Sequence, residues 1–307
     1  MKLFTFKTDS QLHHLGALLD DARAIDVTRL LEDAPNTRQA GPVPRQVLDL
    51  IEREDQGASL MADMGTLSEE TKNQYAIAMD TIEWCAPIVR PKRNIFCVGR
   101  NYKAHIIEGN IARGRDLNDF PKAVEFFTKP PSTAIGHLGY ISAYGDVTKM
   151  LDYEVELAIV IGKGGINIAA ENAMEHVFGY TIVNDVTARD LQNLHGQWFK
   201  GKALDGTCPM GPFIVPSPFI ERPDQLRISL EVNGDLRQDS NTSDLLFGIS
   251  EIICQLSKGM ALEPGDVIAT GTPSGVGLGL NPQKFLQAGD RITAHIESIG
   301  TLTTTII

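Results

Sequence analysis

Short apolar runs separated by glycine and proline fill the last two thirds of the chain. The clearest are ELAIVIG and FGYTIVND, followed by GPFIVPS, LRISLEVNG and RITAHIES. Runs of this length between turn residues predict β-strands. Asn233 and Gly234 lie between two alternating segments and predict a hairpin turn. Two stretches with helical apolar spacing, 169–176 and 244–259, predict helices between the strands.

The first part of the chain has a different pattern. LFTF predicts a short strand, Gly16 predicts a turn, and apolar spacing after Pro44 predicts a helix. Ser68 and the acidic residues after it predict the start of an amphipathic helix. No βαβ periodicity is present, which argues against a doubly wound parallel sheet. We therefore expect an α+β protein, mainly β, with a small α/β module over 1–88 and a larger domain over 89–307.

Carboxylates interrupt the apolar pattern at the start of the strongest run. Asp152, Glu154 and Glu156 alternate with apolar residues, so a strand would place all three on one face. Asp185 ends the next run. Burying unpaired like charges costs several kcal/mol each, and a hard divalent cation would neutralise them. These carboxylates are therefore candidates for a metal site; the alternative is an acidic strand face in contact with water.

A histidine and a carboxylate form a second candidate group. His105 and Glu108 are three residues apart in GRNYKAHIIEGN, so on a helix they share a face. A carboxylate beside an imidazole orients the ring and raises its basicity, which a general base needs. The charged segment IARGRDLNDF that follows is typical of a mobile cover. The alternative is an ordinary surface pair.

Candidate ligand-binding residues follow Asp185. Arg189 and Gln192 are three apart and can both project toward a bound anion. Lys202 lies in the glycine-flanked turn FKGKALDG, where a cation can stabilise an enolate or carboxylate oxygen. The segment ATGTPSGVGLGL lacks the lysine of a phosphate-binding loop. We interpret it as a tight loop that presents backbone N–H groups and the Thr272 hydroxyl to a ligand; the alternative is a cluster of plain turns.

Composition narrows the class of protein. The net charge of −11 argues against nucleic acid or an anionic membrane as a partner. No apolar run approaches the roughly 20 residues of a membrane span, and the N-terminus lacks a signal-peptide core. The four cysteines are scattered, which indicates reduced thiols. We expect a cytoplasmic enzyme that acts on a small molecule.

An ordered set of motifs resembles the fumarylacetoacetate hydrolase family from about residue 93 to 307. The motifs are GRNYxxHxxE, FxKPPS, DYEVELAIVIG, GYTIVNDVTARDLQ, QWFKGKALDGTCPMGP and PGDVIATGTPSGVG. Each motif alone is weak, but their order is specific. The resemblance implies a mixed β-sandwich roll, a homodimer and one Mg²⁺ ion, with Mn²⁺ or Ca²⁺ as alternatives. It implies that Glu154, Glu156 and Asp185 are the metal ligands.

The resemblance also implies roles for the remaining candidates in the chemistry of a 2-oxo acid. His105, Glu108 and Lys202 would be catalytic. Arg189, Gln192 and Thr272 would contact the substrate. Members of the family hydrolyse C–C bonds of acylpyruvates, decarboxylate oxaloacetate-like diacids, or isomerise and tautomerise oxo-enoates.

Three functions follow in order of expectation. The first is a Mg²⁺-dependent hydrolase that cleaves a C–C bond of an acylpyruvate or fumarylacetoacetate-type substrate through a metal-bound enolate. The second is an isomerase, tautomerase or decarboxylase of an unsaturated 2-oxo diacid. The third is a non-catalytic metal-binding β protein. The segment between Glu108 and FFTKPPS, which would form the lid, is longer than in compact members of the family. The substrate of those members therefore cannot be inferred for this chain from the lid.

Overall fold

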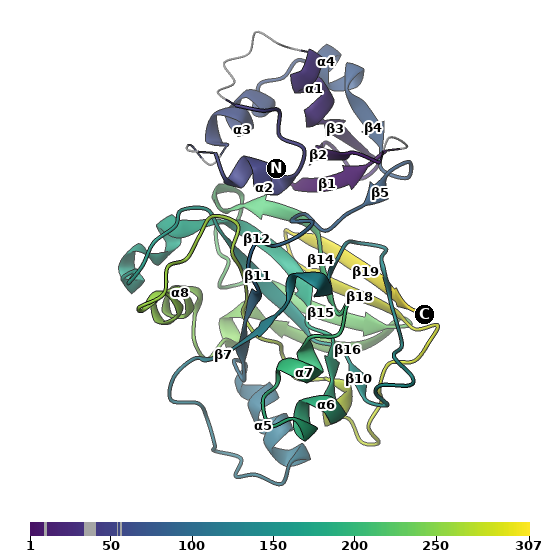
Figure 1. The fold of residues 1–307 in the computed structure, drawn as a ribbon, viewed down its shortest axis with the longest axis vertical. Helices are drawn as coiled ribbons and strands as arrows, with labels where there is room; N and C mark the ends of the chain where they lie inside the picture. The colour runs from purple at the N-terminus through teal and green to yellow at the C-terminus, as the bar shows by residue number, and fades with distance from the viewer. Residues whose placement is uncertain (9–10, 34–40, 54, 56) are drawn as a thin grey trace.

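The computed structural model describes residues 1–8, 11–33, 41–53, 55 and 57–307. Figure 1 shows a smaller lobe formed by the N-terminal segment above a larger lobe formed by the rest of the chain. Strands dominate the larger lobe, and the smaller lobe combines a sheet with short helices, so the prediction of an α+β protein, mainly β, is confirmed. No helix of the described ranges has the length and apolar character needed to cross a bilayer.

The smaller lobe is a sheet covered by helices. Its strands run antiparallel in the order β4 (Ala76–Ala78), β3 (Arg23–Asp26), β2 (His13–Leu18) and β1 (Leu3–Lys7), and β5 (Glu83–Trp84) also pairs with β1. Its helices are α1 (Val27–Asp33), α2 (Val47–Ile51), α3 (Ala58–Gly65) and α4 (Glu69–Gln74). The helices bury Leu31, Leu50 and Met64 in the same core as Leu15 of the sheet.

Two predictions for this lobe are corrected by the structure. Gly16 lies inside β2, where an added Cβ would be 2.4 Å from Phe4 Cζ, so the glycine makes room for a ring and forms no turn. The helix predicted after Ser68 begins as expected, with the Ser68 hydroxyl accepting a hydrogen bond from the Thr71 N–H, but it ends at Gln74. The next residues form β4, because pairing with β3 replaces the helical alternative.

The sheet continues without a break into the larger lobe. β1 pairs with β14 (Cys208–Pro216), and the order continues through β12 (Val177–Asn184), β11 (Val155–Ile161), β17 (Val267–Ala269), β6 (Ile95–Gly99) and β7 (Glu125–Lys129). β8 (Ala134–Ile135) pairs with β14. Every residue of β11 and β12 is buried. Burial of both faces explains why these runs are apolar throughout instead of alternating.

A second sheet packs against the first. Its order is β16 (Asp235–Asn241), β15 (Arg227–Val232), β18 (Arg291–Ile296), β19 (Gly300–Ile306) and β9 (Tyr140–Ile141). Leu157 and Ile159 of β11 share a core with Leu230 of β15. The predicted hairpin joins β15 and β16, with Asn233 and Gly234 at φ 55° and 82°. Two packed sheets with both parallel and antiparallel pairs form the expected mixed β-sandwich roll.

Short elements fill the edges of the larger lobe. The helices are α5 (Lys103–Ala112), α6 (Arg189–Leu194), α7 (Phe199–Lys202) and α8 (Ile249–Ser257), and β10 (Leu151–Asp152) pairs with β13 (Thr187–Ala188). Short 3₁₀ helices are η1 (Pro131–Thr133), η2 (Ala170–His176), η3 (Ser217–Phe219), η4 (Thr242–Asp244) and η5 (Gly277–Gly279). The helix predicted over 169–176 is therefore 3₁₀, and the one predicted over 244–259 is α-helical only from Ile249.

The cysteines and the lobe boundary complete the fold. All four thiols are free, as predicted, and those of Cys85, Cys97 and Cys208 are buried. The sheet and one hydrophobic core run through both lobes. Because the two lobes share this sheet and this core, a domain boundary at residue 88 stays a prediction from the sequence.

Candidate active site

Three carboxylates meet where β11 begins and β12 ends. Glu156 lies in β11, Glu154 precedes it, and Asp185 directly follows β12. The register of the two strands places these ends side by side, and the Asp185 N–H donates to the Glu154 carbonyl at 2.8 Å. Ligand oxygens of the three side chains all lie within 4.8 Å of one another, and all three residues are buried. The structure therefore brings together the three predicted metal ligands.

Asp152 does not join this cluster, contrary to the prediction that one strand face carries Asp152, Glu154 and Glu156. The chain breaks between β10, which contains Asp152, and β11, which begins at Val155. The alternation of faces is lost across this break. Asp152 instead faces Arg189, whose Nε lies 2.8 Å from its Oδ2.

Buried cations surround two of the clustered carboxylates. The Lys202 ammonium lies 2.7 Å from Glu154 Oε2 and 2.7 Å from Asp185 Oδ2, and Arg189 Nη1 lies 2.6 Å from Glu154 Oε1. Burial alone would raise the pKa of Glu154, but Lys202 and Arg189 outweigh it and hold the pKa well below its usual range. Burial would likewise lower the pKa of Lys202, yet Asp185 and Glu154 raise it.

Glu156 is the exception in this cluster. Burial, followed by the negative charges of Asp185 and Glu154, raises the pKa of Glu156 well above its ordinary value. Its carboxylate accepts a hydrogen bond from the Gly271 N–H at 2.8 Å, and no ion pair to it occurs within the described ranges. Glu156 is thus the carboxylate of the cluster without a cation partner among the described residues. Hard carboxylate oxygens in this arrangement fit a divalent cation such as Mg²⁺, Mn²⁺ or Ca²⁺.

Close packing of two short helices brings the predicted cations to the cluster. Gly201 of α7 lies against α6, where an added Cβ would be 2.5 Å from the Gln192 N and 2.7 Å from the Ala188 carbonyl oxygen. Only glycine allows this approach. It places Lys202 beside Arg189 and Gln192, and all three side chains are buried.

The predicted His–Glu pair forms on α5. His105 Nδ1 lies 3.2 Å from Glu108 Oε2, and both side chains are mostly buried. The other carboxylate oxygen of Glu108 accepts a hydrogen bond from the Gly275 N–H at 2.9 Å. The ring is therefore oriented by a carboxylate that is itself fixed, as a general base requires.

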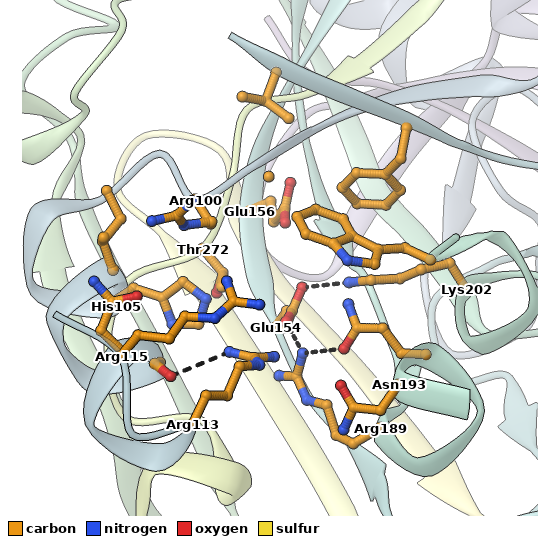
Figure 2. Close-up of a pocket in the computed structure, with 18 of the residues that line it drawn as sticks. Arg100, His105, Arg113, Arg115, Glu154, Glu156, Arg189, Asn193, Lys202 and Thr272 are labelled. Carbon is orange, nitrogen blue, oxygen red and sulfur yellow. Dashed lines mark hydrogen bonds and ion pairs between the residues drawn. The ribbon is translucent and has the colours of Figure 1, made fainter. Parts of the chain in front are cut away.

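These groups converge on one cavity of about 200 Å³. Figure 2 shows it between α5 and the α6–α7 pair. Its walls include seven of the nine residues predicted from the sequence: His105, Glu154, Glu156, Arg189, Gln192, Lys202 and Thr272. Glu108 and Asp185 lie behind this wall and contact its members. The Thr272 hydroxyl accepts a hydrogen bond from Gln238 Nε2 at 2.8 Å.

The glycine-rich segment differs from its sequence-based interpretation. We expected its N–H groups to face a ligand, but those of Gly271 and Gly275 bind the carboxylates of Glu156 and Glu108. Those of Gly277 and Leu278 bind Asp152 at 2.7 and 3.1 Å. The loop therefore holds functional carboxylates of the protein in place, and Thr272 is the residue of the loop that lines the cavity.

Sequence reasoning missed two kinds of cation at this site. Lys129, in the motif FxKPPS, is fully buried, and its ammonium lies 2.9 Å from Asp185 Oδ1 and 3.0 Å from the Val186 carbonyl oxygen. The available signal was a lysine between the run VEFFT and two prolines. Arg113 and Arg115 line the cavity from the end of α5. They belong to the charged segment that we interpreted only as a cover.

Comparisons with known proteins agree with the fold and identify the family. The family model described as fumarylacetoacetate (FAA) hydrolase C-terminal matches residues 94–307. This chain belongs to the fumarylacetoacetate hydrolase family.

Similar proteins within the family carry several activities. The chain is 43% identical over 296 residues to "Oxaloacetate tautomerase YisK" of Bacillus subtilis (strain 168), with 95% of each chain covered. A fumarylacetoacetate hydrolase from Exiguobacterium antarcticum is 39% identical with a TM-score of 0.79, over 100% of this chain and 99% of that one. Maleylpyruvate hydrolase from Sphingobium sp. SYK-6, in complex with manganese (II) ion and pyruvate, is 30% identical with a TM-score of 0.74, over the same shares.

Proposed function

We propose that this protein is a divalent-metal-dependent enzyme that interconverts the keto and enol forms of a small 2-oxo diacid of the oxaloacetate type. The observation that carries the proposal is a small cavity in which an acidic cluster, a His–Glu dyad and two arginines meet. These arginines, Arg113 and Arg115, lie at the end of α5 and are called the lid arginines below. The similarity of this chain to an oxaloacetate tautomerase, over 95% of its length, supports the same reaction. Sequence analysis placed hydrolysis first; the cavity and its arginines favour this alternative.

In this proposal the carboxylates of Glu154, Glu156 and Asp185 hold the metal. A bound divalent ion supplies Lewis-acid polarisation of the 2-oxo group. Mg²⁺ is our first choice, and Mn²⁺ and Ca²⁺ suit the same oxygen ligands. Lys202, whose ammonium already lies between two of these carboxylates, donates to the oxygen on which negative charge develops.

The proton is moved by His105. Enolisation breaks one C–H bond at C3, forms the C2–C3 double bond and places a proton on the 2-oxygen. The imidazole of His105 accepts the C3 proton, and Glu108 stabilises the imidazolium that results. The imidazolium then gives this proton to the 2-oxygen, so the O–H bond that forms balances the C–H bond that breaks. The reverse sequence returns the proton to C3, and no further reactant is consumed.

The lid arginines favour a second carboxylate on the substrate. Partial burial at the cavity, followed by the positive charges of Arg189 and Arg115, lowers the pKa of Arg113, although part of this residue is exposed to solvent. Cations crowded in this way gain most from an anionic ligand. The cavity of about 200 Å³ is smaller than the ~300–1,000 Å³ of sites for drug-sized ligands, which favours a short diacid.

Hydrolysis of a C–C bond is the second candidate. The same dyad can activate a water molecule instead of accepting a carbon-bound proton, and maleylpyruvate hydrolase has the same fold at 30% identity. Decarboxylation would use the same enolate without the histidine. A non-catalytic metal-binding role remains third, because it leaves the dyad and the arginines without a task.

The test is an assay of purified protein with oxaloacetate. We expect the enol absorbance in the ultraviolet to decay faster with protein than without it, and EDTA to abolish the acceleration until Mg²⁺ is restored. Product analysis separates the candidates: unchanged total oxaloacetate indicates tautomerisation, pyruvate with CO₂ indicates decarboxylation, and two acids from an acylpyruvate indicate hydrolysis. No acceleration with any of these substrates in excess Mg²⁺ would exclude the enzymatic proposals.

We further propose a homodimer, as the family resemblance implies. Several large apolar side chains near the cavity are exposed, among them Ile111, Leu194 and Phe199. Exposed apolar side chains of this size are stabilised when a second copy of the chain covers them. A molar mass of twice the 33.5 kDa of one chain is expected from light scattering, and the mass of one chain would contradict it.

A further inference from the structure

Asp152 is a buried carboxylate that the proposed reaction does not use. It has no exposed surface and accepts four hydrogen bonds. Its Oδ1 accepts from the N–H groups of Gly277 and Tyr153 at 2.7 and 3.0 Å. Its Oδ2 accepts from the Leu278 N–H at 3.1 Å and from Arg189 Nε at 2.8 Å. A carboxylate bound by three backbone groups cannot turn, so it offers the arginine a fixed partner.

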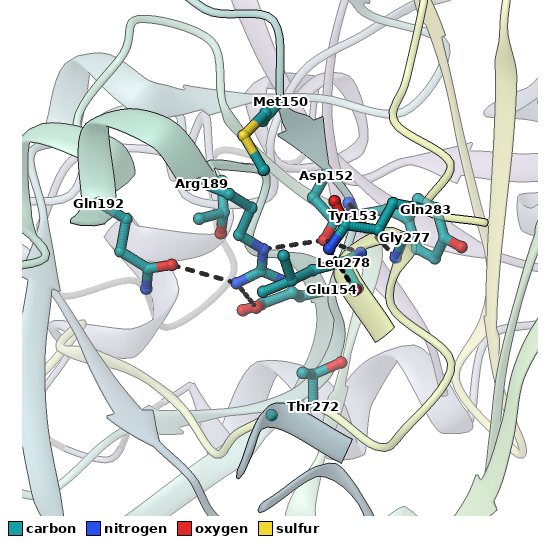
Figure 3. A network of polar contacts seen from close by, with 12 residues as sticks. Met150, Asp152, Tyr153, Glu154, Arg189, Gln192, Thr272, Gly277, Leu278 and Gln283 are labelled. Carbon is teal, nitrogen blue, oxygen red and sulfur yellow. Dashed lines mark hydrogen bonds and ion pairs between the residues drawn. The ribbon is translucent and has the colours of Figure 1, made fainter. Parts of the chain in front are cut away.

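Arg189 is held at two of its three nitrogens. Nε binds Asp152, and Nη1 binds Glu154 Oε1 at 2.6 Å and Gln192 Oε1 at 3.4 Å (Figure 3). Nη2 is buried and has no hydrogen-bond partner in the described part of the chain. The guanidinium group is planar, so fixing two nitrogens also fixes the direction of the third. Arg189 lines the cavity, and Nη2 is its guanidinium nitrogen without a partner among the described residues.

The partners of Asp152 connect this arginine to the rest of the site. The glycine-rich loop that binds Asp152 through Gly277 and Leu278 also binds Glu108 through the Gly275 N–H. An added Cβ at Gly279 would lie 2.2 Å from the Glu108 side chain, so the loop and α5 are in close contact. Asp152 therefore binds both Arg189 and the loop that holds Glu108 of the His–Glu dyad.

We infer that Asp152 is a positioning residue for substrate binding: it fixes Arg189 so that Nη2 faces the cavity and grips a carboxylate of the bound oxo acid. The inference rests on the proposed function for the identity of the ligand. Asp152 touches neither substrate nor metal. Its loss is expected to weaken anion binding through Arg189 and to leave proton transfer by His105 largely intact.

The first test measures binding without turnover. The probe is oxalate, a small dicarboxylate that resembles the chelating half of a 2-oxo acid, titrated calorimetrically into Mg²⁺-loaded protein. We expect Asp152→Asn, which keeps the shape and removes the charge, to weaken oxalate binding at least tenfold. In turnover with oxaloacetate, we expect KM to rise by a similar factor while kcat stays within about threefold.

Asp266→Asn is the matched control. Asp266 is also buried, pairs with Arg93 and accepts the Glu263 N–H at 2.7 Å, but it lies outside the cavity wall. Both variants lose the charge of a buried carboxylate and with it an ion pair to an arginine, so both are expected to have a lower Tm. Only Asp152→Asn is expected to change oxalate affinity. Equal oxalate affinity in the two variants would overturn the inference, whatever their Tm.

A double-variant comparison tests the route through Arg189. If Asp152 acts through the arginine, adding Asp152→Asn to Arg189→Gln produces no further loss of oxalate affinity. A further tenfold loss would show that Asp152 acts otherwise and would overturn the inference. This comparison also serves if Asp152→Asn alone does not fold, because the double variant leaves no arginine facing a neutral partner.

Failure of the proposed function gives a different result. A wild-type protein that binds oxalate but does not accelerate enolisation would remove the tautomerase proposal. Loss of oxalate binding in Asp152→Asn under those conditions would still support the positioning role.

Discussion

Two buried acids of the cluster, only two residues apart, differ in what surrounds them. Glu154 has Lys202 and Arg189 within ion-pair distance, whereas the only polar contact found for Glu156 in the described residues is one backbone N–H. A buried carboxylate without a cation partner destabilises the fold. Removing a carboxylate that has a cation partner leaves the cation buried and unpaired, and this also destabilises the fold. The same chemical change at the two positions should therefore have opposite effects.

Glu156→Gln and Glu154→Gln test this difference. Without metal, we expect Glu156→Gln to leave stability unchanged or to raise it, because a repelled charge is removed. We expect Glu154→Gln to lower the free energy of unfolding by about 3 kcal/mol, because a buried ion pair is broken. Thermal unfolding in EDTA measures both. Both variants should bind Mg²⁺ at least tenfold more weakly by calorimetry, and unchanged affinity in either would remove that residue from the ligand set.

His105→Ala tests the dyad. We expect kcat for enolisation to fall by about 10²–10⁴, the usual contribution of a positioned general base, with Mg²⁺ affinity unchanged. Stopped-flow absorbance and calorimetry measure the two quantities. Lys103→Ala, on the same helix and exposed, is the control and should keep wild-type kcat. Near wild-type turnover in His105→Ala would exclude the histidine from the reaction.

Among the elements, those buried on both faces were the easiest to predict from sequence. β11 and β12 are apolar runs with acids at their ends, and this pattern located the metal cluster. The position of Asp152 could not be predicted, because the break after β10 has no sequence signal and the partner, Arg189, is 37 residues away. Gly16 was misinterpreted because a glycine that makes room for Phe4 looks the same in sequence as a glycine in a turn.

The glycine loop shows a similar limit. Its glycines predicted exposed N–H groups, and the structure contains these donors. Their partners come from Asp152, Glu156 and α5, so only the tertiary fold decides that the donors bind the protein's own carboxylates. Lys129 could have been noticed as a charge at the end of strand β7, directly before two prolines, but its partner Asp185 lies 56 residues further on.

His137, in the turn between β8 and β9, predicts a pH dependence of stability. Burial, followed by the charge of Arg291, lowers the pKa of His137 to about 4 from 6.5. Its Nδ1 accepts a hydrogen bond from the Thr303 N–H of β19 at 3.0 Å, which requires the neutral ring. The unfolded chain binds the proton more readily than the folded one, so this residue's contribution is complete above pH 6.5 and is lost as pH falls toward 4.

His137→Asn keeps a hydrogen-bond acceptor and cannot ionise. Between pH 7 and pH 4, we expect the wild type to lose about 2 kcal/mol more unfolding free energy than this variant, less than the full shift would give because part of the ring contacts water. Urea unfolding at several pH values measures the difference. Parallel pH profiles for the two proteins would contradict the assignment.

In the whole molecule, the two lobes share a sheet. β1 of the smaller lobe pairs with β14 of the larger, and residues of both lobes form one core. Apolar patterning predicts each lobe separately, but it does not show that the edge of one sheet is completed by the other. The family model begins at residue 94 and so omits this completing strand.

A chain shortened to residues 89–307 tests the dependence. We expect it to be mostly insoluble or to unfold at least 10 °C below the full chain, because the uncovered edge of β14 and the apolar side chains behind it would meet water. Solubility and thermal unfolding measure the effect. Recovery of a folded, Mg²⁺-binding fragment with wild-type Tm would show that the smaller lobe is dispensable.

The loop over residues 271–278 has a consequence for how new activities arise in this scaffold. Because one short segment supports an acid of the metal cluster, the partner of the histidine and the partner of Arg189, a substitution there disturbs all three at once and is hard to tolerate. The arginines at the far end of α5 do not support several functional groups at once in this way. We therefore expect substitutions that change substrate preference to occur at that end of the helix, while the residues bound to this loop stay the same.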